Sequence, residues 1–277
     1  MTMISKIYAL IQITFRESFA KKTFMAFFGI STLICLLFMF ALNLDIVDGV
    51  KSSISLFGKE TGELIDIEEV IFKIESAVAV LLFSGGLFMS LFATSGLIPS
   101  LMRQGNVDLL ISKPLGRFHI LLGRYLGAVA IVAFNVFYLV IFSWLILSFK
   151  TGFWHGGFLL AGIMIIITFA ILYALMTLLG VVTRSGAFSL MITYLILFFS
   201  PLLLQRDQIY ALLTGRIWGV ILDGLYHFLP KTSELGNITR LLVQGEPVSS
   251  WTALWTSLIF GIIMLTTSTY IFSRKNF

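Results

Sequence analysis

The sequence predicts an all-α polytopic membrane protein with six transmembrane helices. Of its 277 residues, 58% are hydrophobic and only 12% are charged, and the mean hydropathy is +0.99. Soluble domains carry about 25% charged residues, and a soluble fold of this size could not bury so much apolar surface. Membrane-spanning strands would alternate apolar and polar residues, whereas the apolar runs in this chain are apolar on every side.

Six apolar runs are long enough to cross a bilayer, whose hydrocarbon core of about 30 Å needs roughly 20 helical residues. None of them contains Asp, Glu, Lys, Arg or His. The predicted spans are residues 24–42, 77–101, 125–149, 157–182, 187–205 and 251–272.

Residues 1–23 predict an amphipathic helix at the membrane interface ahead of the first span. Apolar residues recur there at spacings of three and four, which places them on one helical face. They are Ile4, Tyr8, Ile11, Phe15 and Phe19. The first apolar run is long enough to span and no small-residue cleavage pattern follows it, so a signal peptide is not predicted. An ordinary lead-in helix is the alternative.

The charge distribution predicts that both termini are cytoplasmic, as in a protein of the bacterial inner membrane. With the N-terminus inside, segments 1–23, 102–124, 183–186 and 273–277 hold 11 Lys+Arg and 2 acidic residues. The opposite segments, 43–76, 150–156 and 206–250, hold 8 Lys+Arg and 12 acidic residues. This asymmetry follows the positive-inside rule, so the net charge of +5 reflects orientation and no nucleic-acid partner is expected.

The outer segment 206–250 is predicted to be helical without spanning. Residues 209–229 are mostly apolar, yet Arg216 and Asp223 lie seven residues apart on one helical face. If this stretch spanned, Arg274 and Lys275 would lie outside, against the charge rule. The sequence leaves open whether residues 209–229 lie at the interface or re-enter the membrane.

No catalytic motif is found in the sequence. Gly58-Lys59 is followed by Glu60 and lacks the upstream glycine of a phosphate-binding loop, so this chain is not expected to bind ATP. The three histidines, His119, His155 and His227, fall in predicted loops and are expected to be solvent-exposed. We therefore expect no enzyme activity, metal site or bound cofactor, and the charge-free spans argue against a proton-coupled carrier.

Four polar or small residues inside the spans are candidates for a substrate path or for helix contacts. Asn135 is the one amide deep inside a span, and an interhelical hydrogen bond is the simpler interpretation. Gly86, Ser90 and Thr94 form a ridge of small residues at four-residue spacing, as do Gly123 and Gly127. Such ridges mark close helix contacts, either within the chain or between protomers.

The connection at residues 103–124 is the most informative segment. Asn106 can cap a short helix that runs to Ser112, and Pro114 then breaks it. The connection is compact and basic, and it is longer and more apolar than a plain cytoplasmic turn requires.

This connection resembles the cytoplasmic loop of permease subunits of type-2 (export-class, type V fold) ABC transporters. The matching residues, in order, are Gly105, Asp108, Leu109, Leu110, Ser112, Lys113, Pro114, Arg117, Gly123 and Arg124. Asp108 departs from the Glu that is more usual at its position. The stretch 225–248 is most similar to the nitrous oxide reductase maturation and gliding-motility branches of that family.

The resemblance implies a permease that pairs with a second permease, identical or paralogous, and with two separate ATPase subunits that bind ATP and Mg. Residues 105–112 would form the coupling helix. The implied coupling residues are Gly105, Asn106, Asp108, Leu109, Leu110, Ser112, Lys113, Pro114 and Arg117. The resemblance does not determine the substrate. A non-transporting membrane scaffold or a channel subunit is the alternative.

Overall fold

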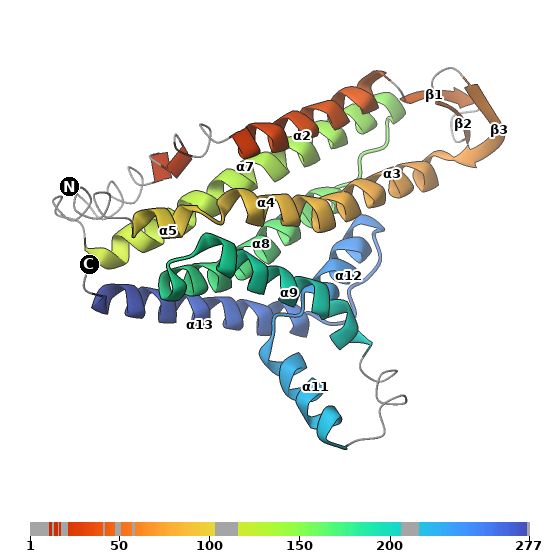
Figure 1. Cartoon of the computed structure of the whole chain (residues 1–277). Helices are drawn as coiled ribbons and strands as arrows, with labels where there is room; N and C mark the ends of the chain where they lie inside the picture. The colour runs from red at the N-terminus through yellow and green to blue at the C-terminus, as the bar shows by residue number, and fades with distance from the viewer. Residues whose placement is uncertain are drawn as a thin grey trace.

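The fold is that of a computed structural model, in which residues 11–12, 14–15, 17, 22–40, 42–47, 51–56, 59–102, 116–205 and 216–275 are described. Long helices run side by side, and a small sheet extends from one end of them (Figure 1). Five helices are long and apolar enough to cross a membrane, and a shorter apolar helix covers residues 24–40. The multi-pass helical membrane protein predicted from the sequence is therefore confirmed.

The helices of this body follow the predicted spans with shifted ends. They are α2 (Lys22–Phe40), α3 (Ile67–Leu81) continued by η1, α4 and α5 to Leu101, α7 (Arg117–Thr151), α8 (Gly157–Thr183), α9 (Gly186–Leu204) and α13 (Thr252–Arg274). The largest shifts are at the second helix, which begins ten residues before the predicted start, and at α7, which begins eight residues early. Polar residues in the first turns of these helices hid the extensions from a hydropathy criterion.

The second membrane helix is interrupted twice. A π-helical turn, η1 (Leu82–Gly86), joins α3 to α4 (Leu87–Thr94), and a turn at Ser95 and Gly96 separates α4 from α5 (Leu97–Leu101). Gly85 and Gly86 lie in the π-helical turn, where their low helix propensity makes departure from the α-helix less costly. Single π-helical turns of this kind are frequent at functional sites.

Successive helices cross the body in alternating directions, which gives it two distinct ends. At the loop end, Met102 and Gly116 bracket the predicted coupling loop, and α8, α9 and α13 have their Thr183, Gly186 and Arg274 termini. The α8–α9 turn there is tight: Arg184 has φ 56°, and a Cβ on Gly186 would lie 2.8 Å from the Ser95 carbonyl oxygen. The opposite end is called the sheet end.

A three-stranded antiparallel sheet connects α2 to α3 at the sheet end (Figure 1). Its strands, in the order β1-β2-β3, are β1 (Leu42–Val47), β2 (Lys51–Leu56) and β3 (Lys59–Asp66). Leu42 pairs with Leu56 and Lys51 pairs with Asp66, with a bulge between Ser53 and Ser55. No strand was predicted here, because hydropathy identifies membrane spans and gives no information on the polar connections between them.

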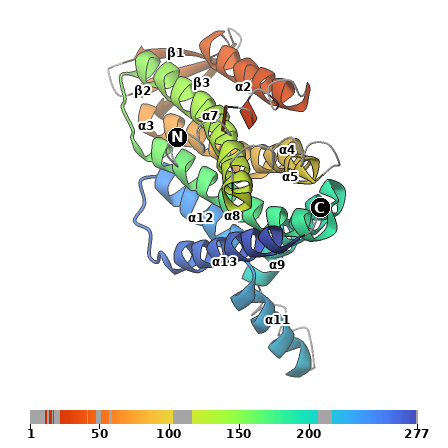
Figure 2. The same cartoon turned by 90° about the vertical axis from the view of Figure 1, so that its left-hand side faces the viewer.

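The described part of the outer segment, residues 216–250, contains two helices that differ in their packing. Helix α11 (Arg216–Phe228) projects away from the body, as Figure 2 shows, and Phe228 is exposed. Helix α12 (Thr232–Val243) packs against α8, α3 and α9 and buries Leu235 and Val243 completely. Both helices lie within the segment that the sequence predicts to be helical, although the mixed composition of residues 232–243 gave no separate boundary for α12.

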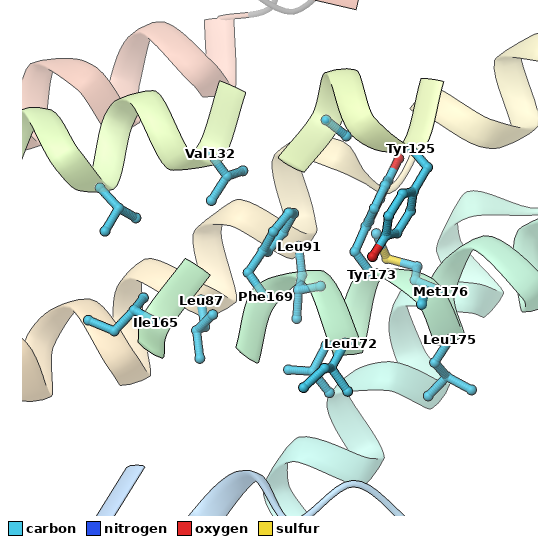
Figure 3. Close-up of a cluster of buried hydrophobic side chains, with 14 of the residues drawn as sticks. Leu87, Leu91, Tyr125, Val132, Ile165, Phe169, Leu172, Tyr173, Leu175 and Met176 are labelled. Carbon is cyan, nitrogen blue, oxygen red and sulfur yellow. The ribbon is translucent and has the colours of Figure 1, made fainter. Parts of the chain in front are cut away.

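Helix α8 is the centre of the body. Its residues 171–177 are buried without interruption, so neighbours surround nearly two turns on every side. Figure 3 shows Phe169 and Tyr173 of α8 among aliphatic side chains, with Tyr125 of α7 beside Tyr173. The rings of Phe169 and Tyr173 stack at 5.4 Å, and those of Tyr125 and Tyr173 at 5.6 Å. A Cβ on Gly261 would lie 3.4 Å from the backbone of Ile171, so α13 also approaches α8 closely.

Replacing the central ring, in Phe169→Ala, is expected to lower the free energy of unfolding by about 3 kcal/mol, because it leaves a cavity that the packed helices cannot fill. This is the low end of the range for soluble cores, since lipid is as apolar as the core itself. The control is Phe134→Ala. Because the Phe134 side chain is 48% exposed, its removal should lower the free energy of unfolding much less. Denaturant unfolding in detergent measures both, and equal losses would contradict the central role of α8.

Candidate functional site

The predicted coupling residues Gly105, Asn106, Asp108, Leu109, Leu110, Ser112, Lys113 and Pro114 lie outside the described residues. The described structure does include the two positions that bracket them, Met102 at the end of α5 and Gly116 at the start of α7. It also includes Arg117, the last of the predicted coupling residues.

Arg117 ties the start of α7 to the end of α13. Its Nη1 donates to the Ser273 carbonyl oxygen at 3.2 Å and to the Lys275 carbonyl oxygen at 2.6 Å. Lys275 in turn donates from Nζ to the Val181 and Val182 carbonyl oxygens near the end of α8. Cations are favourable at the C-terminal ends of helices, where carbonyl groups lack intrahelical partners. The loop end therefore holds α7, α8 and α13 together through basic side chains.

A second cation at the loop end holds the N-terminal segment against α7. Arg124 is 8% exposed, forms a salt bridge to Glu17, and donates from Nη1 to the Thr14 hydroxyl at 3.4 Å. One turn further along α7, a Cβ on Gly127 would lie 2.7 Å from the Cβ of Thr14, so only glycine allows this approach. The predicted ridge of Gly123 and Gly127 thus includes a contact within the chain.

The charge reversal Arg124→Glu is expected to release residues 11–17 from α7, because two carboxylates would then face each other at a mostly buried site. Amide hydrogen exchange of this segment should rise by at least about tenfold, since losing a partner in a buried pair costs several kcal/mol.

The double reversal, Glu17→Arg with Arg124→Glu, should restore slow exchange. Arg184→Glu is the matched control, because Arg184 is exposed at the same end. Unchanged exchange in the single variant, or no recovery in the double one, would show that this pair does not hold the segment.

Asn135 makes the interhelical hydrogen bond that the simpler interpretation predicted. Its Oδ1 accepts from the Ser31 hydroxyl of α2 at 3.0 Å, and both side chains are buried. The Nδ2 group of Asn135 has no hydrogen-bond partner among the described residues. Ser31 also borders an apolar hollow, so this polar pair lies next to a space within the membrane-spanning helices.

The ridge of Gly86, Ser90 and Thr94 faces inward. All three residues are buried, and a Cβ on Gly86 would meet Leu82 and Phe27 at 3.2 and 3.9 Å. The Thr94 hydroxyl donates a hydrogen bond to the Ser90 carbonyl oxygen at 2.7 Å, within the same helix. Within the described residues, this ridge serves contacts between helices of the same chain.

A buried acid–base pair lies at the sheet end. Glu75 of α3 is 1% exposed, and its Oε2 lies 3.1 Å from Nδ1 of His155. Phe72 packs edge-on against the His155 ring, and the Trp144 indole donates to the His155 carbonyl oxygen at 2.7 Å. Burial lowers the pKa of His155, which favours the neutral ring.

This pair corrects one expectation. His155 is not a solvent-exposed loop residue, because the α7–α8 turn folds it onto α3. Its partner Glu75 was not among the predicted site residues, and it lies buried in the apolar helix Ile71–Leu101. A sequence signal was present: Glu75 lies four residues after Ile71 and four before Ala79, on the same buried face.

Truncation in His155→Ala is expected to lower the free energy of unfolding by about 1–3 kcal/mol, because it leaves the Glu75 carboxyl buried without this partner. Adding Glu75→Leu should recover most of the loss. His227→Ala is the control, since His227 is exposed and should change stability by less than about 0.5 kcal/mol. Thermal unfolding in detergent tests this, and a loss that persists in the double variant would contradict it.

Among the described residues, no group of three or more His, Cys, Asp or Glu side chains is placed to hold a metal ion. Neither a protein-family model nor a curated protein matches this chain.

Proposed function

We propose that this chain is the transmembrane permease subunit of an ABC transporter, and that it moves a substrate by alternating access. In this proposal it pairs with a second permease, identical or paralogous, and with two ATPase subunits that bind ATP and Mg. In the same proposal all six predicted spans cross the membrane, and α2 forms residues 24–40 of the first one. Both termini then lie in the cytoplasm of a bacterial cell, in agreement with the excess of Lys and Arg in the segments at the loop end.

The observation that carries the proposal is the sequence pattern of the connection between α5 and α7, from Gly105 through Arg124. The pattern combines the sequence signals for a capped short helix and a Ser-Lys-Pro turn with a basic start to the next span. The described structure supports this assignment by placing both ends of the connection at the loop end. Glu17 of the N-terminal segment, the second element expected to face the ATPase, is held at the same end by Arg124.

The shape of α7 is suited to transmit motion from such a connection. It is a single helix of 35 residues, about 52 Å long at 1.5 Å per residue, and so longer than the hydrocarbon core. A displacement at Gly116 would therefore be transmitted to the sheet end along one helix that has no break. Arg117 and Arg124 would carry the same displacement into α13 and into the N-terminal segment.

In this mechanism, ATP-driven closure of the ATPase pair moves the coupling helix and the N-terminal segment together. The two permeases then change between inward-facing and outward-facing arrangements, and nucleotide state selects between them. The roles proposed for Gly105, Asn106, Asp108, Leu109, Leu110, Ser112, Lys113 and Pro114 are contacts to the ATPase. Arg117 is proposed to position the end of the coupling loop through its bonds to α13.

The deciding experiment is purification of the tagged chain from its native membranes in mild detergent, followed by mass spectrometry of co-purifying proteins. We expect a stoichiometric ATPase with a phosphate-binding loop. The Asp108→Arg variant should reach the membrane but lose the ATPase, because the reversed charge would oppose the contact surface. Asp108 is a better test than Arg117, whose substitution also removes the contacts to α13.

The matched control is Lys73→Glu, a charge reversal of an exposed residue toward the sheet end, which should retain the ATPase. Reproducible absence of any ATPase from the unmodified chain would favour a membrane scaffold. Ion conductance in bilayers without ATP would favour a channel subunit.

A further inference from the structure

Two neighbouring hollows share one lining residue in the π-helical turn of the second membrane helix. The first has a volume of about 400 Å³ and lies between α2, η1, α4 and α9. The second, also about 400 Å³, lies between α3, α9 and α12. Ser84 lines both, so they lie on either side of one residue, and Figure 1 shows α3 and α4 between α2 on one side and α9 and α12 on the other.

The two hollows differ in chemistry. The first is almost wholly apolar, and Phe27, Ile34, Met89 and Phe198 are among its walls. Gly85 opens it further, because a Cβ built there would meet nothing within 4 Å. Ser84 turns its hydroxyl back to the Val80 carbonyl oxygen at 2.7 Å, which reduces its polarity toward the hollow. This space suits a hydrocarbon chain.

The second hollow has a polar, cationic side formed by α12. Arg240 is the one ionisable residue among its described lining residues, and it is exposed. One guanidinium nitrogen, Nη2, donates to Oδ1 of Asn237 at 3.2 Å, and Arg240 forms no ion pair with a described acidic residue. Because Arg240 occupies this amide oxygen, the remaining guanidinium N–H groups and the Asn237 amide N–H groups are donors. This donor-rich, positively charged side is complementary to an anion.

From this arrangement we propose that the two neighbouring hollows together bind an amphiphile with one hydrocarbon chain and a phosphate headgroup, which passes over Ser84. The chain lies in the hollow beside Gly85, and the phosphate lies against Arg240 and Asn237. The combined space is within the range of ligand pockets, which are mostly apolar with a few placed polar groups. The connection that follows α12 leads to Trp251 at the start of α13. Because tryptophan is enriched at the membrane–water interface, this placement agrees with a lipid headgroup bound by α12 at the same depth. The site does not depend on the proposed transport function.

The test uses the full-length chain in phosphatidylcholine nanodiscs and a photoreactive lysophosphatidic acid with a diazirine near the end of its chain. A monoacylglycerol with the same chain and diazirine reports binding without the phosphate. Labelled residues are identified by mass spectrometry. We expect adducts on the walls of the first hollow, saturable labelling, and about tenfold weaker apparent affinity for the neutral probe, the size of effect that one charge-assisted hydrogen bond supplies.

Two substitutions address the two halves of the site, each with a control. Gly85→Leu should abolish labelling by filling the chain space, whereas Gly29→Leu, another helical glycine with nothing within 4 Å of its Cβ, should not. Arg240→Gln should weaken labelling about tenfold, whereas Arg274→Gln at the loop end should not. Monodisperse elution in size-exclusion chromatography establishes that each variant is folded.

Three results would overturn the proposal. Labelling spread evenly over lipid-facing helices and insensitive to Gly85→Leu and Arg240→Gln would indicate ordinary bilayer lipid. Inorganic phosphate that competes as strongly as unlabelled lysophosphatidic acid would show that the hydrocarbon chain contributes nothing to binding, and would indicate a site for the free anion. Cross-links that join two copies through this surface would assign it to the permease dimer. None of these results bears on whether an ATPase co-purifies, so the two proposals can fail separately.

Discussion

The structure depends on the burial of the middle of α8, where residues 171–177 are enclosed on every side. A helix inside a bilayer gains little from hiding apolar side chains, because lipid is as apolar as its neighbours, so association rests on close packing and polar contacts. Helix α8 is packed all round between residues 171 and 177, and α7, α9, α12 and α13 all contact it. The stacked rings of Phe169, Tyr173 and Tyr125 fill the centre with rigid side chains. The remaining helices are positioned by how they meet this one.

Polar pairs fix the two ends of this packing. Arg124 and Glu17 join the N-terminal segment to α7 at the loop end, and Glu75 and His155 join α3 to the α7–α8 turn at the sheet end. Each pair replaces hydration that its members lose on burial, so removing one member leaves the other unsatisfied. Between these ends, the continuous α7 connects the side on which we propose ATPase contacts to the side on which we propose an amphiphile site. The interrupted helix α3–α5 lies beside it and carries the hollows.

Much of the fold could be predicted because a bilayer restricts what can cross it. Backbone groups must be satisfied within a span, so a long apolar run is a helix, and five such helices are found among the described residues. The same rule failed where a polar side chain lies near the start of a helix, as Glu75 and Arg117 do, since hydropathy alone begins the span after them. It also gave no information on the sheet, or on the bounds of α12, whose buried Leu235 and Val243 are separated by a mixture of polar and apolar residues.

The sequence by itself determined the class of protein, the approximate spans, the sign of the charge at each end and the pattern of the connection at 103–124. These depend on local composition and on the energy of placing charges in a membrane, which each segment meets alone. Only the tertiary structure decided that Arg117 bonds to the end of α13, that Thr14 meets Gly127, that Asn135 meets Ser31, and that Ser84 lines two hollows. Those are contacts between residues far apart in the chain, and their partners are set by how the helices pack around α8.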